Sequence, residues 1–432
     1  MRILVLNVGT AAARAIHRQL WMIDEGDVVV SPIAVDETFL RYVCGALGID
    51  PDAVRLVVHP DGLTDPALVA PGLVARLRAA VGDADAYLAP AAHTEGVAAL
   101  AGLLGLPLGP GLRFAAQRGP VLLNRKSHFR QLAVGAGLPV PDGSVVTGAR
   151  ALTDAVARHL PRTGTVVVKR DDDLGGQGNI AVTLGPTDPL PGVARTLSAA
   201  DPRAAAESLW AELTDADNRL LVVESYHPAT HSFYTEYLIA EDGGVTFLNS
   251  GGIRRCPDPD PDAEELVWVG LELPAELPPG AASRALTAAA RMVALAAAVG
   301  YRGHINVDAI LTTEGEVLFN EVNARWGGSL ALHTLGTRLL GPNYADHHVI
   351  SGLRDITPLP VAEALRVLDA TGLAFSAGSG EGVVLVGCDP RLGAPLECVA
   401  IAPSRARARQ IEDRLRRAVA RPEAVASGRG RR

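Results

Sequence analysis

YRGHINVDAILTTEGEVLFNEVNARWGGS, residues 301–329, is the stretch from which the fold of this chain can be worked out. It reads as two runs of alternating polar and apolar residues, His304–Thr313 and Glu316–Asn323, joined at Glu314-Gly315. A two-residue connection with glycine second predicts a β-hairpin, because glycine accepts the positive φ that such turns require.

The hairpin is expected to gather polar side chains on one face. Pairing about its turn places Asp308 opposite Glu321, with Cβ atoms roughly 4.5–5.5 Å apart, and Asn323 points to the same face. Opposed carboxylates repel each other unless a cation lies between them or one is protonated. Oxygen ligands with room for phosphate oxygens suit Mg²⁺ (or Mn²⁺). The pattern predicts a metal–nucleotide site; a solvated acidic face is the alternative.

The residues that follow the hairpin support the metal–nucleotide interpretation. Arg325 comes directly after it, and Gly327-Gly328-Ser329 offers backbone N–H groups that suit an anionic substrate. The flanking residues are apolar enough for a buried sheet. We therefore expect a metal and nucleotide at this face, with substrate near the glycine pair.

Composition narrows the class of protein. The chain has 432 residues, 48% of them hydrophobic, which suits two or three domains. A net charge of −8 and a pI near 5.8 argue against a general nucleic-acid binder. Four scattered cysteines, with no visible signal peptide or membrane span, favour a cytoplasmic protein that does not bind membranes.

Lysine is rare, and both lysines stand where phosphate binding is expected. Of 40 basic residues only Lys126 and Lys169 are lysine. Lys126 falls in the first turn of a helix predicted over residues 122–141, with Asn124 as its N-cap. Lys169 ends a buried strand and precedes a glycine-rich loop, whose backbone N–H groups can approach a polyphosphate. The glycines of that loop are Gly175, Gly176 and Gly178.

Other segments support weaker expectations. Residues 1–115 alternate strand and helix, which predicts an α/β domain with a mostly parallel sheet. Residues 220–226 predict a buried strand whose end suits an adenine. Its Glu224 is expected to meet the exocyclic amine or to form a salt bridge. Arg254 and Arg255 follow two glycines. We expect them to have a catalytic role by binding a carboxylate or phosphate, or else to neutralise the acidic run that follows.

The order of these motifs resembles the ATP-grasp superfamily of carboxylate–amine ligases. The resemblance covers residues 120–350, and the N-terminal part is similar to the pre-ATP-grasp domain. Three segments look most like the pheganomycin-type peptide ligases: SPIAVDETFLRYVCGALGID, NEVNARWGGS and TGLAFSAGSGEGVVL. The implied fold is α/β, with α+β character in the ATP-binding part. The implied domains are pre-ATP-grasp at 1–118, ATP-grasp at 119–350, a small C-terminal α/β unit at 351–420 and a disordered tail at 421–432.

The resemblance implies a role for each matching residue. Lys126 and Lys169 would hold the α- and β-phosphates, and the glycine loop would close over the γ-phosphate. The adenine would lie against Glu224, Ser225, Tyr226 and His227. Asp308, Glu321 and Asn323 would bind Mg²⁺, and Arg325 would stabilise the transferring phosphoryl group. Relatives hold the ribose with an acidic residue where this chain has His231, so His231 or Glu236 is the expected contact.

The implied reaction joins a small carboxylic acid, through an acyl phosphate made from ATP, to the amine of an amino acid or peptide. Specialised peptide biosynthesis is the expected setting. A non-catalytic nucleotide-binding module and an ATP-dependent carboxylase or kinase are the alternatives. Monomer and homodimer are both compatible with the sequence. We also expect Gly378–Gly382, in the C-terminal unit, to contact the amine; a packing cap or a dimer surface is the alternative role for this unit.

Overall fold

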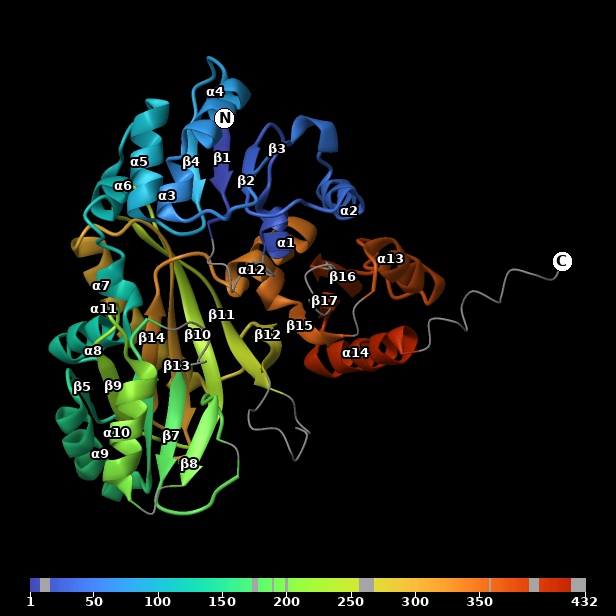
Figure 1. Ribbon diagram of the computed structural model, residues 1–432. Coiled ribbons are helices and arrows are strands. Elements are labelled where there is room, and N and C mark those ends of the chain that lie inside the picture. The colour runs from blue at the N-terminus through green and yellow to red at the C-terminus, as the bar shows by residue number, and fades with distance from the viewer. Residues whose placement is uncertain are drawn as a thin grey trace.

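The computed structural model describes residues 1–7, 16–172, 178–188, 190–198, 201–255, 268–356, 359–387 and 396–420. Within these ranges the strands form sheets of four, five and eight strands. In Figure 1 the four-stranded sheet lies at the top and the five-stranded sheet at the lower left. The long strands of the eight-stranded sheet run between them. Of the predicted disordered tail, residues 421–432 all lie outside the described ranges.

The N-terminal domain is the α/β unit that its alternating pattern predicts. Its strands are β1 (Arg2–Val5), β2 (Val28–Ser31), β3 (Arg55–Val58) and β4 (Tyr87–Pro90). They pair in the order β3-β2-β1-β4, all parallel, which confirms the expected sheet. The helices are α1 (Ile16–Gln19), α2 (Glu37–Leu47), α3 (Asp65–Leu68), α4 (Pro71–Val81), α5 (Glu95–Leu104) and α6 (Pro110–Ala115), with 3₁₀ turns at Leu20–Met22 and Pro51–Ala53.

The five-stranded sheet has one face covered by two helices. Its order is β5 (Gly143–Val146), β9 (Leu221–Ser225), β6 (Thr165–Arg170), β7 (Asn179–Thr183) and β8 (Arg195–Ser198). Helices α9 (Ala149–Thr163) and α10 (Pro202–Leu213) bury their apolar faces against it in one hydrophobic cluster. The predicted buried strands that carry Lys169 and Glu224 are therefore adjacent, as β6 and β9.

The eight-stranded sheet joins the middle of the chain to its C-terminal part. Its order is β14 (Val317–Asn323), β13 (Gly303–Thr312), β10 (Ala229–Ile239), β11 (Val245–Arg255), β12 (Trp268–Leu273), β15 (Val349–Ile356), β17 (Leu396–Ala402) and β16 (Gly382–Gly387). Its helices are α11 (Pro279–Ala298), α12 (Gly328–Leu340), α13 (Val361–Ala370) and α14 (Arg405–Val419), with a 3₁₀ turn at Tyr344–Asp346.

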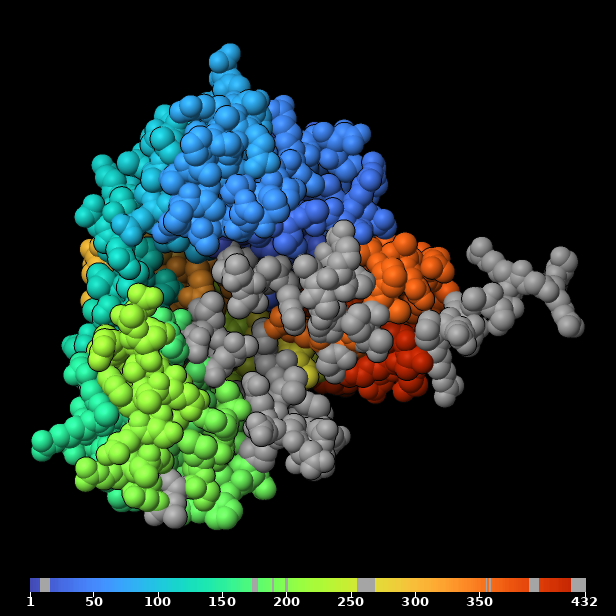
Figure 2. Space-filling model, viewed as in Figure 1, coloured from blue at the N-terminus to red at the C-terminus, as the bar shows by residue number. Residues whose placement is uncertain are grey.

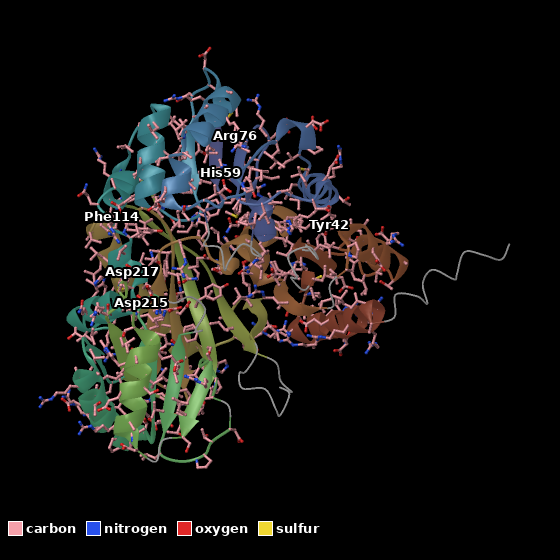
Figure 3. The ribbon with its side chains drawn as sticks, in the orientation of Figure 1. Tyr42, His59, Arg76, Phe114, Asp215 and Asp217 are labelled. Atoms are coloured by element: carbon pink, nitrogen blue, oxygen red, sulfur yellow. The ribbon has the colours of Figure 1, made fainter. Side chains whose placement is uncertain are left out.

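The C-terminal unit is not separate in the way the sequence suggested. Its strands β15, β17 and β16 continue the sheet of β10 to β14 rather than forming one of their own. One hydrophobic cluster also contains residues of α2, α12, β16 and α14. Tyr42 of α2 lies at this junction (Figure 3), and its hydroxyl accepts a hydrogen bond from Leu385 N–H at 3.1 Å. The N-terminal domain and the last strands thus share a core.

The predicted hairpin forms, but with a different turn. Thr312 N–H donates to Glu316 O at 2.8 Å, so three residues rather than two connect β13 to β14, and Gly315 has the positive φ of +84°. The longer turn shifts the pairing by one residue. A β-bulge at Asn320 shifts it back, and Asp308 faces Glu321 as predicted.

The predicted helix over residues 122–141 is two helices. α7 (Val121–Asn124) ends at Arg125, whose backbone is extended, and α8 (Lys126–Gly135) begins at once. Asn124 is therefore not the N-cap of α8. That position is served by Asp171, whose Oδ1 accepts from Ser127 N–H at 2.7 Å. Because Asp171 follows Lys169 by two residues, this cap brings the two lysine-bearing elements together.

Figure 2 shows three parts around the middle of the molecule: the N-terminal domain, the five-stranded sheet with its helices, and the C-terminal elements α13 and α14.

Among the described helices, none is both long enough and apolar enough to cross a membrane.

Candidate active site

A cavity of about 530 Å³ lies where these parts of the chain meet. The five-stranded sheet contributes Lys169 and Glu224, and the hairpin of β13 and β14 contributes Asp308 and Glu321. The N-terminal domain contributes Asn7, Arg18, Gln19 and Ala92. Predicted site residues from distant parts of the sequence therefore line one space. They are Lys126, Lys169, Glu224, Ser225, Tyr226, His227, Asp308, Glu321, Asn323, Arg325, Gly327, Gly328 and Ser329.

The two facing carboxylates differ in their charge environment. Burial raises the pKa of Asp308 well above its usual range, and the charge of Glu321 raises it further. Burial also opposes ionisation of Glu321, yet the cationic Lys126 and Arg325 hold its pKa below the usual value. Burial and the neighbouring charge thus oppose ionisation of Asp308, and a cation beside the pair favours it.

Asn323 completes this face of the hairpin. Its Nδ2 donates to Asp308 Oδ2 at 3.1 Å and to Glu321 Oε1 at 3.4 Å, while its Oδ1 accepts from Arg325 Nη2. A metal-binding role for that oxygen requires the amide to flip. Two carboxylates and one amide leave coordination positions for phosphate oxygens, so the donor set fits Mg²⁺.

Lys126 and Arg325 place two cations against this acidic group. Lys126 Nζ lies 3.4 Å from Glu321 Oε2. Arg325 Nη1 donates to Asn124 Oδ1 at 2.8 Å, and the same oxygen accepts from Ala324 N–H at 2.9 Å. Asn124 therefore ties the end of α7 to the segment that follows β14 and orients Arg325. The sequence suggested a different role for it, as a helix cap.

Lys169 lies in a buried ion-pair network with Glu224. Its Nζ is 2.5 Å from Glu224 Oε2, and Arg130 Nη1 lies 2.9 Å from Oε1 of the same carboxylate. Of the two roles weighed for Glu224, the structure contains the salt bridge. Arg130, on α8, did not stand out in the sequence.

The end of β9 retains a backbone group for adenine. Ser225 N–H donates to Asp142 O at 2.7 Å, and Tyr226 N–H donates to Thr165 O at 3.0 Å. His227 N–H has no backbone acceptor in the described part of the chain. His227 is thus the position from which a backbone donor can reach a base.

Several predicted residues lie elsewhere. Arg254 does not line the cavity: it pairs with Glu412 of α14 at 2.8 Å and donates to Gly352 O at 2.9 Å. Arg254 therefore does not lie where the expected catalytic role requires it. Arg255 ends β11, and its side chain lies outside the described residues, as do Gly175 and Gly176. Gly178 is described, and its carbonyl accepts from Arg170 N–H at 2.9 Å.

His231 also lies away from the cavity. Ser232 and Tyr234 line it, whereas Phe233 packs in the core on the other face of β10. Because side chains alternate along a strand, His231 shares the face of Phe233. Its ring nitrogen Nδ1 lies 3.0 Å from Thr230 Oγ1. The expected ribose contact from His231 is therefore wrong in position.

Glu236, the alternative ribose contact, lies buried behind the glycine pair. Its Oε1 accepts from Ser329 Oγ at 3.0 Å and its Oε2 from Asn249 Nδ2 at 2.7 Å. Burial raises the pKa of Glu236 to about 7, although both hydrogen bonds lower it. The group fixes the start of α12 and does not line the cavity.

Gly378–Gly382 does not line the cavity either, although we expected it to contact the amine. A Cβ at Gly380 would meet His348, and one at Gly382 would meet the backbone of Phe375. The C-terminal unit instead reaches the site through Glu397 of β17, whose Oε2 lies 3.3 Å from Arg18 Nε. No local pattern marked either residue, because they are brought together only by the shared core.

Two family models match parts of the chain. Residues 16–106 match the model described as Pre ATP-grasp domain, and residues 363–415 match the PGM1 C-terminal domain. No curated protein matches the sequence.

Solved structures resemble the chain over nearly its whole length. An N5-carboxyaminoimidazole ribonucleotide synthetase in an ADP complex has a TM-score of 0.61 at 13% identity, covering 96% of each chain. Biotin carboxylase from Campylobacter jejuni has 0.58 at 16%, covering 94% of this chain and 88% of its own. An L-amino acid ligase from Bacillus licheniformis has 0.55 at 15%, covering 96% and 97%. The chain therefore has the ATP-grasp fold, with a pre-ATP-grasp domain at its N-terminal end.

Proposed function

We propose that this protein is an ATP-dependent ligase that joins a carboxylic acid to the amine of an amino acid or peptide. The observation that carries the proposal is the meeting of Lys126, Lys169 and Arg325 with the facing pair Asp308 and Glu321 in one cavity. Cations suited to a polyphosphate and carboxylates suited to a divalent metal are both needed for phosphoryl transfer.

The residues divide the work between binding and charge neutralisation. Lys126 and Lys169 bind the α- and β-phosphates of ATP, and the end of β9 at His227 receives the adenine. Asp308 and Glu321 hold Mg²⁺, which neutralises charge on the phosphate oxygens when it is bound. Arg325, oriented by Asn124, faces the γ-phosphate and the acid that attacks it.

The reaction then has two steps. An oxygen of the acid attacks the γ-phosphorus, the bond to the β-phosphate oxygen breaks, and ADP leaves. The neutral amine attacks the acyl carbon, phosphate leaves with the electrons of its C–O bond, and the amine proton passes to solvent. Positioning and charge neutralisation accomplish both steps, so no protein nucleophile is needed.

The finer assignment rests on sequence resemblance. Three segments resemble the pheganomycin-type peptide ligases, which favours a peptide or amino acid amine and a biosynthetic role. Similarity in fold to an L-amino acid ligase is compatible with this choice. Fold similarity to carboxylases is equally extensive, so the reaction type is tested directly.

The test measures ADP release with Mg²⁺, ATP and a panel of carboxylic acids, each with hydroxylamine. Hydroxylamine traps an acyl phosphate as a hydroxamate, which is measured by its iron(III) colour. Mass spectrometry then identifies amides formed when hydroxylamine is replaced by amino acids. We expect acid-dependent ADP release and hydroxamate. ADP release that depends on bicarbonate indicates a carboxylase, a stable phosphorylated product a kinase, and nucleotide binding without turnover a regulatory module.

A further inference from the structure

A second polar group lies in the cavity where the N-terminal domain meets α12. Arg18 of α1 is only 8% exposed, yet it lines the cavity. A Cβ added to Gly328, the first residue of α12, would lie 2.4 Å from Arg18 Nη1. The guanidinium therefore occupies the space that a side chain at Gly328 would fill.

One side of the Arg18 guanidinium pairs with a carboxylate, and the other side faces the cavity. Its Nε lies 3.3 Å from Glu397 Oε2. Its Nη1 and Nη2 donate no hydrogen bond to any residue in the described part of the chain. Arginine presents five N–H donors in a planar fork, so its outer edge retains donors for a ligand.

The start of α12 adds donors beside this guanidinium. Gly327 is the N-cap and provides no side-chain acceptor, so the first N–H groups of this 13-residue helix have none from their cap. The positive end of the helix dipole favours an anion at the same place. Arg18 and Gly328–Ser329 thus form one anion-binding corner.

Two buried acceptors border that corner. Gln19 Oε1 and Asn306 Oδ1 have no hydrogen-bond partner among the described residues, although both side chains line the cavity and are more than nine-tenths buried. Buried acceptors without partners are costly. Solvent does not reach these two oxygens, so an N–H donor of a ligand satisfies them only after the amides turn towards the cavity. The combination of anion donors with amide acceptors matches a carboxylate next to an amine.

We infer that Arg18 and the N–H groups of Gly328 and Ser329 bind the α-carboxylate of the amine substrate, an α-amino acid or a peptide with a free carboxylate. Gln19 and Asn306, once their amides turn towards the cavity, accept hydrogen bonds from its amino group. The inference rests on the proposed ligase function and adds which end of the substrate is recognised. This carboxylate is not the one that is activated, because the reacting acid must lie at Arg325.

A phosphate group fits the corner less well. A single guanidinium balances a single negative charge, and two amide oxygens beside it would repel the additional oxygens of a phosphate. Glu397 has a positioning role: it forms an ion pair with the guanidinium on the Nε side, without a hydrogen bond to Nε, and Nη1 lies towards α12. A substrate that offers one carboxylate and adjacent N–H groups satisfies all of these side chains.

The experiment compares amine substrates that differ only in this carboxylate. Each of the twenty standard amino acids and its α-carboxamide is supplied with ATP and an acid that supports hydroxamate formation. We expect the carboxylate form of the best acceptor to have a KM at least 10-fold lower than its amide. Arg18→Gln should raise KM for that acid form by about 10–100-fold, the value of one charged hydrogen bond. It should leave KM for the amide and for ATP within twofold.

Two further variants keep the inference testable if Arg18→Gln does not fold. Gly328→Ala should push the guanidinium aside and cause the same selective loss. Glu397→Gln should cause a smaller one. Arg338→Gln is the matched control, since Arg338 also joins α12 to the N-terminal domain, through Ile23 O and Asp24, but lies outside the cavity.

The outcomes separate this inference from the proposed function. If no acid yields hydroxamate, the ligase function fails and the inference falls with it. If hydroxamate forms but acid and amide acceptors react equally well, or Arg18→Gln affects both alike, the ligase stands and the carboxylate corner is wrong. If inorganic phosphate inhibits the wild type but not Arg18→Gln, and the KM for amino acids does not depend on Arg18, the corner binds a phosphate instead.

Discussion

Lys126 Nζ lies 3.4 Å from Glu321 Oε2, so a cation at the start of α8 meets a carboxylate of β14 inside the cavity. This contact explains why the facing carboxylates differ. Lys126 helps hold the pKa of Glu321 low, whereas burial and the charge of Glu321 raise that of Asp308. Glu321 is thus the more readily ionised member of the pair, and a cation between the two carboxylates favours ionisation of Asp308.

Replacing Glu321 with Gln should lower kcat by about 10²–10³-fold or more, because it removes a charge that stabilises the metal and transition state. Activity should be measured at limiting Mg²⁺, together with the melting temperature. Glu316→Gln is the control, since Glu316 is exposed on the same hairpin. Unchanged turnover in the Glu321 variant would remove the hairpin from the site.

Replacing Lys169 or Lys126 with Met should weaken ATP binding by about 10–100-fold each, since a charged hydrogen bond contributes roughly 1.5–3 kcal/mol. Calorimetric titration with ATP and Mg²⁺ measures this. The Lys169 variant should still fold, because Glu224 keeps its ion pair with Arg130.

The control for the lysines is Arg170→Met. Arg170 follows Lys169 in β6 but points to Asp215, labelled in Figure 3, with Nη2 2.8 Å from Oδ2. ATP affinity that is native in both lysine variants, or reduced equally in the Arg170 variant, would contradict the lysine assignment.

Glu236 should make stability depend on pH. Its pKa is about 7 in the folded protein, compared with an ordinary value of 4.5. Folding therefore favours the neutral form of Glu236. Its contribution to the free energy of unfolding is complete below pH 4.5 and is lost as the pH rises to about 7. The difference amounts to roughly 3 kcal/mol.

Glu236→Gln tests that dependence, because the variant cannot titrate at this position. The free energy of unfolding, measured by denaturant from pH 4.5 to 8, should fall for the wild type relative to the variant across this interval. A constant difference between the two proteins over the whole interval would show that Glu236 has an ordinary pKa.

Arg254→Met should destabilise the protein by about 3 kcal/mol and leave kcat unchanged. It leaves Glu412, only 1% exposed, without its closest pairing partner, and loss of one member of a buried ion pair is costly. Arg409, 2.9 Å from the same carboxylate, limits the loss. A large fall in kcat at constant stability would restore Arg254 to the catalytic site.

The hairpin shows how much of the local structure the sequence predicts. Alternation and a glycine turn predict β13 and β14 because both signals are local. The turn is longer than predicted, and the bulge at Asn320 compensates, so Asp308 faces Glu321 by two deviations that cancel. A bulge depends on packing on both faces of the sheet, and no local pattern marks it.

Residues whose role depends on distant partners were missed. Asn124 has the residue type of a helix cap, but it orients Arg325, two hundred positions away. Arg18 and Glu397 belong to opposite ends of the chain. Arg254 follows two glycines, as many anion-binding arginines do, and was therefore expected to bind an anion. Its partner, Glu412, lies on α14. Motif spacing predicts which residues suit phosphate, whereas only tertiary packing decides which of them face the cavity.

The continuity of the eight-stranded sheet has a consequence for synthesis on the ribosome. Arg18 emerges from the ribosome long before β17, which holds its partner Glu397. Domains generally fold as their residues emerge, N-terminal part first. The lysines and the hairpin proposed to bind ATP are then in place before the anion-binding corner is complete. On the proposed function, a growing chain therefore acquires the groups that bind nucleotide before those that select the amine.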